Sequence, residues 1–142
     1  MVAFGKPVEA PQDWPLIYAY TRRQAIEDGW LVDLMQEETA PLVRRLGFRI
    51  PVAMTRAAFV ETVAPIEADL PEGESLKARL VAVLAATRGA IRMLAGGADR
   101  VIFRLLVRDY ETGQPKRVAL KAVCGPGDEG EPVLTIMLPE ED

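Results

Sequence analysis

The stretch SLKARLVAVLAATRGAIRMLAGGADRVIFRLLVRDY, residues 75–110, contains the pattern that decides the fold. Its first part carries apolar residues at the three- and four-residue spacing of an amphipathic helix, which predicts a long helix over about 75–95. Gly96 and Gly97 follow this helix and provide its stop. The apolar stripe consists of Leu76, Leu80, Val83, Leu84, Ile91 and Leu94.

After residue 100 the hydrophobic period falls from about 3.6 residues to two. Alternation of this kind is typical of a strand with one buried and one solvated face. Arg104 and Arg108 belong to the solvated face. The apolar face consists of Val101, Phe103, Leu105 and Val107.

Two further apolar runs follow this strand, RVALKAVC at 117–124 and PVLTIML at 132–138. The connections before them, ETGQPK at 111–116 and GPGDEG at 125–130, contain the glycine and polar residues of hairpin turns. Residues 100–138 therefore predict a three-strand antiparallel meander.

The N-terminal part of the sequence breaks into short elements. Three prolines punctuate residues 1–15, which predicts an extended arm, and LIYAY at 16–20 predicts a short strand. Thr21 and Gln24 have the spacing of a capping box, so we expect a short helix that ends at Gly29.

A second set of short elements covers the next part of the chain. WLVDL at 30–34 predicts a strand, and a helix closing at Gly47 is expected to hold Pro41 in its first turns. FRIPVAM at 48–54 is extended, and Pro51 within it favours an edge strand or a loop.

Thr55 is placed to cap a further helix running to about Ala64, and PIEADLPEGE at 65–74 is typical of an internal linker. We therefore predict an extended arm followed by a single α+β domain over residues 16–142. In this domain the long helix packs on the C-terminal meander, because each has an apolar face that the other can cover.

The composition narrows the class of protein. The chain has 142 residues, 49% of them hydrophobic, and a net charge of -4, which argues against wholesale coating of nucleic acid or an anionic membrane. No apolar run resembles a signal peptide or a membrane span, and the single cysteine fits a reducing compartment. We expect a cytoplasmic protein.

The missing residue types are more informative. The chain has no histidine and a single serine, Ser75. Histidine is the usual proton shuttle near neutral pH and the usual partner of a serine or cysteine nucleophile, so its absence excludes most hydrolase mechanisms and histidine-containing zinc sites. The sequence predicts no catalytic residue, no metal site and no cofactor.

The glycine-rich segment at 125–130 allows three interpretations. A phosphate-binding loop requires a following lysine and helix, and a calcium loop requires alternating acidic ligands, which this segment lacks. A hairpin turn accounts for its glycines, proline and acids. The neighbouring Cys124 shares the apolar face of its strand with Leu120 and Ala122, which predicts a core position rather than a nucleophile.

Thirteen of the 17 basic residues are arginine, and residues 75–98 contain no acid. Three basic side chains in this segment lie on one side of the expected helix and predict a positive stripe, which Arg104 and Arg108 extend from the sheet. The stripe is a candidate contact for an acidic protein surface or nucleic acid; the alternative is a solvated face. Its helical members are Lys77, Arg88 and Arg92.

A second set of arginines lies at strand-to-helix junctions, where backbone N–H groups and guanidinium groups can bind phosphate. This set comprises Arg22, Arg23, Arg49 and Arg56. In an enzymatic alternative, Glu27, Asp28 or Asp33 serves as the acid or base, although the spacing selects none of them.

Three stretches resemble a family of small bacterial, plasmid and phage proteins of unknown function: IYAYTRRQAIEDGWLVD at 17–33, GFRIPVAMTRA at 47–57 and LKAVCGPGDEGEPVLTIMLPEED at 120–142. The motifs GPGDEGEP and TIMLPEED are the most specific for this family, whereas residues 58–115 show no resemblance to it. The resemblance implies a bacterial or mobile-element setting and a reproducible fold, and it adds a third alternative, a protein that acts on a host system by binding a protein complex. It implies no reaction.

These observations together predict a non-enzymatic protein-interaction or regulatory module with an unidentified protein partner. Two alternatives remain open. One is a nucleotide- or phosphate-binding enzyme without histidine, and the other is a weak, non-specific nucleic-acid binder, because no sequence motif for specific duplex recognition is present. The oligomeric state is open as well.

Overall fold

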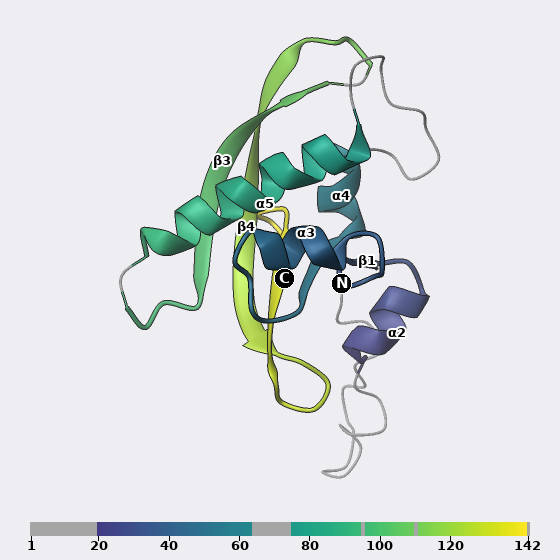
Figure 1. Ribbon diagram of the computed structural model, residues 1–142, viewed down its shortest axis with the longest axis vertical. Helices are drawn as coiled ribbons and strands as arrows, with labels where there is room; N and C mark the ends of the chain where they lie inside the picture. Colours follow the sequence, from purple (N-terminus) through teal and green to yellow (C-terminus); the bar gives the residue numbers. More distant parts are fainter. Residues whose placement is uncertain (1–19, 64–74, 95, 110, 142) are drawn as a thin grey trace.

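A computed structural model describes residues 20–63, 75–94, 96–109 and 111–141. These residues form a five-stranded sheet with helices packed against it (Figure 1). The strands are β1 (Leu31–Asp33), β2 (Val52–Thr55), β3 (Arg100–Arg108), β4 (Pro115–Pro126) and β5 (Pro132–Met137), and the described helices are α2 (Arg22–Glu27), α3 (Ala40–Arg45), α4 (Arg56–Thr62) and α5 (Leu76–Arg92).

The strands lie in the order β1-β2-β5-β4-β3, and every neighbouring pair is antiparallel except β2 and β5, which are parallel. The predicted α+β class is confirmed, and β3, β4 and β5 form the predicted antiparallel meander. The meander is not the whole sheet, however. β2 pairs with the side of β5 that faces away from β4, and β1 pairs with the other side of β2. The pairing of β2 with β5 joins residues about 80 positions apart, and no local pattern in the sequence reports it.

Pro51 lies in the loop before β2, which is one of the two predicted alternatives, but the strand that follows is not an edge strand. β2 begins directly after Pro51 and lies inside the sheet, with Val52, Ala53 and Met54 all fully buried. Pro51 is tolerated because it precedes the strand, where its carbonyl still accepts a hydrogen bond from the backbone N–H of Leu134 at 2.8 Å.

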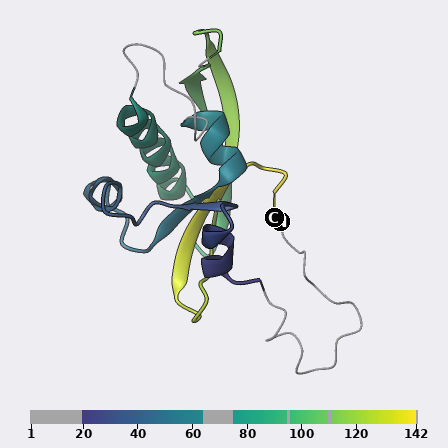
Figure 2. The same cartoon turned by 90° about the vertical axis from the view of Figure 1, so that its right-hand side faces the viewer.

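The predicted long helix is α5, and its packing on the meander is confirmed. Figure 1 shows α5 crossing in front of β3 and β4, and Figure 2 shows α3 and α5 on the same side of the sheet. Leu80 and Leu84 from α5 and Leu120 from β4 are fully buried in one hydrophobic core. The helix ends at Arg92, a few residues before the predicted end, with Met93 as its C-cap.

Side-chain caps begin α2 and α4 as the sequence predicts, whereas α3 has no side-chain cap. Thr21 and Gln24 form a complete capping box at the start of α2, and the Thr55 hydroxyl accepts a hydrogen bond from the Ala58 N–H at the start of α4. Pro41 lies in the first turn of α3. Three predicted segments lie outside the described residues. They are the arm at 1–15, the linker at 65–74 and the strand expected over 16–20, of which only residue 20 is described.

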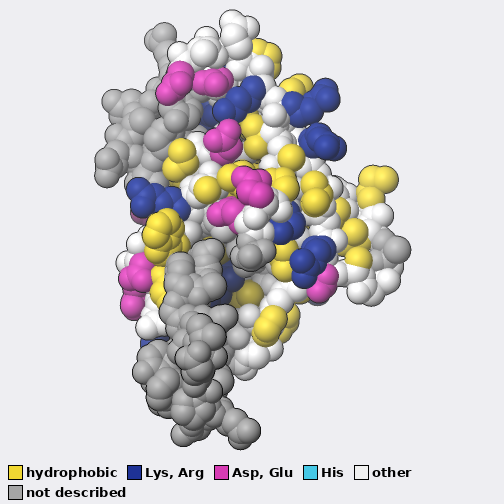
Figure 3. Space-filling model, turned by 180° about the vertical axis from the view of Figure 1, so that it is seen from behind, with side chains coloured by type: hydrophobic (Ala, Val, Ile, Leu, Met, Phe, Trp, Pro, Cys, Tyr) yellow, Lys and Arg dark blue, Asp and Glu magenta, His cyan; other side chains and the backbone are white. Residues whose placement is uncertain are grey.

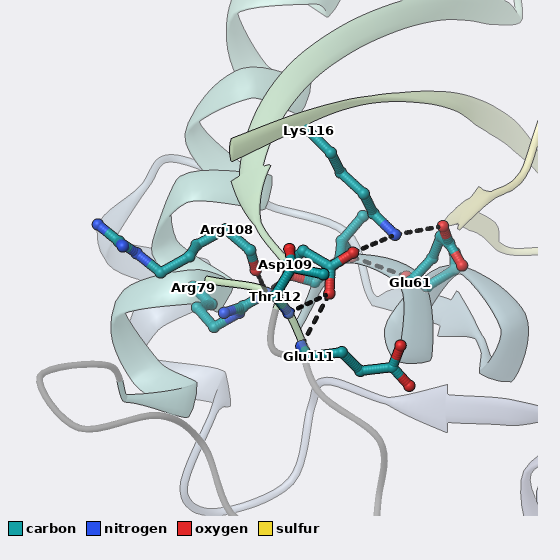
Figure 4. A network of polar contacts seen from close by, with 9 residues as sticks. Glu61, Arg79, Arg108, Asp109, Glu111, Thr112 and Lys116 are labelled. Atoms are coloured by element: carbon teal, nitrogen blue, oxygen red, sulfur yellow. Dashed lines mark hydrogen bonds and ion pairs between the residues drawn. The ribbon is translucent and has the colours of Figure 1, made fainter. Parts of the chain in front are cut away.

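The far end of the β3–β4 hairpin is held by polar contacts (Figure 4). Asp109 accepts hydrogen bonds from the backbone N–H groups of Glu111 and Thr112 at 2.8 and 3.3 Å, and these bonds lower the pKa of the Asp109 carboxyl. Lys116 lies 3.0 Å from a carboxylate oxygen of Glu61 in α4 and 3.8 Å from Asp109. The contacts join the hairpin to the helical layer. None of the described helices is long and apolar enough to cross a bilayer.

Candidate functional site

A cavity of about 510 Å³ opens where the C-terminal half of α5, the start of β3, the end of β4 and the loop between α3 and β2 meet. Its volume falls within the roughly 300–1,000 Å³ that is usual for ligand sites. We call it the arginine-lined pocket. Its lining residues are Gly47, Phe48, Arg49, Ile50, Arg88, Ile91, Arg92, Leu94, Ala98, Asp99, Arg100, Val101, Ala122, Cys124 and Leu134.

The floor of the arginine-lined pocket is apolar. Phe48, Ile50, Ile91 and Val101 are half-buried and pack against the hydrophobic core below them. The core holds these side chains in place, so the floor is part of the folded scaffold rather than a free loop. An apolar group that enters the pocket therefore replaces water against a preformed surface.

The rim of the pocket is strongly positive. Four arginines line it against one carboxylate, Asp99, which lies 3.2 Å from the Nε atom of Arg100. Within the part of the chain that the structure describes, Arg49, Arg88 and Arg92 form no hydrogen bond and no salt bridge through their side chains. Their guanidinium groups each carry five N–H donors and are available to an anion.

The loop before β2 brings Arg49 to this rim and makes room for Arg88. Gly47 has a φ angle of +96°, in the left-handed region that favours glycine. A Cβ atom at Gly47 would lie 3.5 Å from the Nε atom of Arg88, so the loop backbone passes directly beside this side chain. A side chain in place of Gly47 would therefore lie in van der Waals contact with the Arg88 side chain.

The predicted positive stripe is divided by the fold. Arg88 and Arg92 line the pocket, whereas Lys77 lies on the first turn of α5, about 16 Å away along the helix axis. Arg104 and Arg108 are exposed on the face of the sheet turned away from α5, because the alternating residues of β3 point their apolar side chains toward the helix. The sheet therefore separates the two sheet arginines from the helical ones.

The predicted anion-binding arginines also lie in different places. Arg49 lines the arginine-lined pocket. Arg56 is exposed on the first turn of α4, beside Trp30 and Glu61. Arg23 is exposed on α2. The structure thus brings together Arg49 from this set and two arginines from the helical stripe.

Arg22 forms hydrogen bonds within the fold and does not line the arginine-lined pocket. Its guanidinium group donates to the Thr135 hydroxyl at 2.9 Å and to the Leu134 carbonyl at 3.3 Å. Burial lowers the pKa of the Arg22 guanidinium, and the nearby carboxylates of Asp33 and Asp128 act in the opposite direction. The hydrogen bonds tie α2 to β5.

The three candidate acids also lie outside the pocket. Asp28 accepts a hydrogen bond from the Tyr20 hydroxyl at 2.6 Å, which raises the pKa of Tyr20 to about 12. Asp33 accepts from the Met35 N–H at 2.9 Å, and Glu27 is exposed. None of the three lines the arginine-lined pocket.

The interpretation of residues 125–130 as a hairpin turn is confirmed. β4 and β5 are antiparallel on either side of it, and the Gly127 N–H donates to the Glu131 carbonyl at 2.6 Å. Gly130 supplies a φ angle of +84°. In the described residues, no group of three or more histidine, cysteine, aspartate or glutamate side chains is placed to hold a metal ion.

The same turn has a second role that sequence reasoning missed. The Asp128 carboxylate accepts hydrogen bonds from the backbone N–H groups of Arg22 and Arg23 at 2.6 and 3.0 Å. The first turn of α2 therefore already holds an anion from its own chain. The two partners are more than 100 residues apart, and no spacing rule connects them.

Replacing Asp128 with Ala is expected to lower the free energy of unfolding by about 1 kcal/mol, because two N–H groups at the start of α2 lose their acceptor. Chemical denaturation at neutral pH measures this change. Glu129→Ala in the same turn is the matched control, since it removes an exposed carboxylate of the same charge, and should change stability little. Equal effects of the two substitutions would contradict the capping role.

The prediction that Cys124 lies in the core is wrong. Leu120 and Ala122 are buried on the face that α5 covers, as the alternation predicts, but Cys124 is exposed. The helix crosses β4 before the end of the strand, so the last residue of the alternating set lies in the arginine-lined pocket instead of under the helix. Alternation in a sequence indicates on which face of the sheet a side chain lies, but it does not indicate how much of that strand a helix covers.

Comparison with known proteins supports one part of the resemblance, the membership in a family of unknown function, and extends it along the chain. No curated protein and no solved structure matches the chain. A family model described as a family of unknown function, DUF6573, matches residues 12–142. The match includes residues 58–115, where the sequence motifs alone show no resemblance. The chain therefore belongs to the family of unknown function DUF6573.

Proposed function

We propose that the protein is a non-enzymatic interaction module whose arginine-lined pocket binds an acidic segment of a partner protein. One observation carries the proposal: an apolar floor lies beneath three arginines whose side chains have no partner among the described residues. An apolar side chain of the partner fills the floor, and carboxylates beside it bind Arg49, Arg88 and Arg92. Arginine and apolar anchors of this kind dominate the energy of protein interfaces.

The pocket fits an acidic peptide better than a nucleotide. Phe48 is the one aromatic side chain in its lining, and no glycine-rich phosphate loop faces it. It lies at the C-terminal end of α5, where the helix dipole is negative and adds nothing to phosphate binding. Its single carboxylate, Asp99, is engaged with Arg100, which leaves no evident acid or base for an enzymatic reaction.

Extended nucleic acid is also a poorer fit. The basic rim surrounds a concave site instead of forming a long stripe, and the chain carries a net charge of -4. A cytoplasmic protein of bacterial, plasmid or phage origin that binds a host complex agrees with the family resemblance, and we include this setting in the proposal.

The test uses charge reversal in the pocket against matched charge reversal outside it. Arg88→Glu with Arg92→Glu should weaken binding of acidic peptides that carry one aliphatic or aromatic residue by at least about tenfold, since two guanidinium contacts become repulsive. Lys77→Glu with Arg56→Glu changes the charge equally, at exposed first-turn positions where glutamate suits the helix dipole. This control should bind as the wild type does.

Cys124 provides the readout. It is the only cysteine of the chain and lies exposed in the pocket, so its rate of reaction with a maleimide reports whether the pocket is occupied. A bound acidic peptide should slow the reaction in the wild type and in the control but not in the pocket variant. Arg88→Gln with Arg92→Gln repeats the test without introducing acids into the last turns of α5.

Two results would reject the proposal. One is equal loss of peptide binding in the pocket variant and the control, which indicates unspecific attraction of charge. The other is an increase of melting temperature with ATP or GTP that no acidic peptide reproduces, which favours the nucleotide-binding alternative.

A further inference from the structure

β3 lies at the margin of the sheet, with β4 as its one neighbour among the described strands. It is nine residues long, and its register with β4 runs without a bulge from Arg100 opposite Val123 to Arg108 opposite Pro115. Proteins usually protect such an edge with proline, a bulge or a short strand. β3 has none of these three devices; its protection is the charge of Arg100, Arg104 and Arg108, and its backbone edge is long and regular.

The hydrogen-bond pattern identifies the backbone groups on this edge. The Asp99 carbonyl accepts from the Cys124 N–H, and the Asp109 N–H donates to the Gln114 carbonyl, both at 2.8 Å. Hydrogen-bonded positions alternate in an antiparallel pair, so the odd-numbered residues of β3 bond to β4. The N–H and C=O groups of residues 102, 104 and 106 therefore point away from β4.

The same three residues have exposed side chains, as do Arg100 and Arg108 at the two ends of β3. Ile102 and Leu106 are 56% and 64% exposed, and Arg104 lies between them. Across the strand pair, Lys121 lies opposite Ile102 and Arg117 lies opposite Leu106. Figure 3 shows this side of the molecule, where basic, acidic and hydrophobic side chains are interspersed. The residues next to the edge, Ile102, Arg104, Leu106 and Arg117, are apolar or positive.

One end of the edge is already occupied. The guanidinium group of Arg79 in α5 donates to the Arg108 carbonyl at 2.5 Å (Figure 4). A further strand can therefore bond to residues 102–106 but not to the carbonyl at the end of β3. The accessible length still contains three outward-pointing residues, Arg104 with Ile102 and Leu106 on either side.

A second copy of this chain is a poor partner for the edge. Symmetric antiparallel pairing centred on Arg104 places this arginine opposite the same residue of the other copy, and Arg100 opposite Arg108. Like charges directly opposite one another destabilise a strand pair. An extended segment with acidic residues in those places converts the same contacts to attraction.

We propose that β3 accepts an extended segment of a partner protein as an additional strand, with acidic residues beside Arg104 and aliphatic residues beside Ile102 and Leu106. Main-chain hydrogen bonds supply affinity in this mode of recognition, and alternate side chains supply specificity. The surface lies on the far side of the sheet from the arginine-lined pocket, apart from Arg100, and the inference goes beyond the proposed function.

The experiment uses a synthetic peptide of about eight residues that alternates Glu and Val, with hydrogen exchange followed by NMR. In the free protein the amides of residues 102, 104 and 106 should exchange faster than those of 101, 103 and 105. The peptide should slow their exchange at least about tenfold, the protection expected when most of the protein is bound. Arg104→Glu should weaken binding by about tenfold.

A pair of substitutions at Leu106 separates backbone from side chain. Leu106→Pro removes an outward-pointing N–H group and should abolish binding of the Glu/Val peptide, whereas Leu106→Thr keeps the N–H group and should retain most of it. Arg104→Glu remains informative if the proline variant fails to fold. In the Arg88→Glu, Arg92→Glu variant the peptide should protect the amides of residues 102, 104 and 106 as it does in the wild type, even if the variant loses peptide binding at the arginine-lined pocket, so this local readout distinguishes the two sites.

Three outcomes would overturn the inference. The first is no protection of these amides by the peptide at millimolar concentration, and the second is equal binding of a peptide that alternates Lys and Val. The third is a dimer in sedimentation whose β3 amides are protected without any peptide, because it would show that the edge pairs with a second copy.

Discussion

Replacing Leu84 with Ala is expected to lower the free energy of unfolding by about 2–5 kcal/mol. Leu84 is fully buried in the middle of α5, within the core that joins this helix to the sheet. Removing its terminal carbons leaves a cavity between two layers of regular structure, which relax only in part. The contact between α5 and the meander is the main packing interface of the fold.

Urea denaturation followed by circular dichroism measures this loss. Leu76→Ala is the matched control, because it is the same chemical change on the same helix at a side chain that is 43% exposed. We expect it to cost less than about 1 kcal/mol, since little buried surface is lost. Similar losses for the two variants would show that α5 does not pack on the sheet in this orientation.

Arg79→Met is expected to produce the second large loss of stability. Arg79 is buried on α5, where its guanidinium group donates to the Thr62 carbonyl of α4 at 3.3 Å and to the Arg108 carbonyl of β3. Methionine keeps much of the apolar stem but leaves both carbonyls without this donor. The unsatisfied buried acceptor of Thr62 costs about 1–3 kcal/mol, and the part-buried Arg108 carbonyl adds less because water can reach it, so the loss should still exceed that of a surface arginine.

Thermal and urea unfolding of the Arg79 variant measure this cost, with Arg117→Met as the control. Arg117 is exposed on β4, and its replacement should change stability by less than about 0.5 kcal/mol. Hydrogen exchange should also show faster opening at the Arg108 end of β3 in the Arg79 variant. An unchanged unfolding curve would mean that Arg79 does not join α4, α5 and β3.

The sequence predicted local structure well where one period dominates. Leu80, Val83 and Leu84 of the helical stripe are buried, and the alternation of β3 places Phe103, Leu105 and Val107 toward that helix. The caps at Thr21 and Thr55 were also predicted, because a capping residue and its target are three positions apart. In each case the residues that decide the structure are close neighbours in the chain.

The candidate site was predicted only in parts. Helical spacing placed Arg88 and Arg92 together, but Arg49 belonged to a separate set and Arg100 to neither. They line one pocket because the loop after α3 and the start of β3 meet beside the end of α5. Cys124 joins them because α5 does not cover the end of β4. The positions of such loops and ends depend on packing between layers.

By itself, the sequence determined the α+β class, the long helix, the alternation of the strands and the absence of histidine chemistry. These properties depend on the residue types present and on periods of two to four residues. Tertiary structure alone decided the parallel pairing of β2 with β5, the capping of α2 by Asp128 and the assembly of the arginine-lined pocket. Each of these joins groups that are distant in sequence, and their meeting is set by how the helices and the sheet pack.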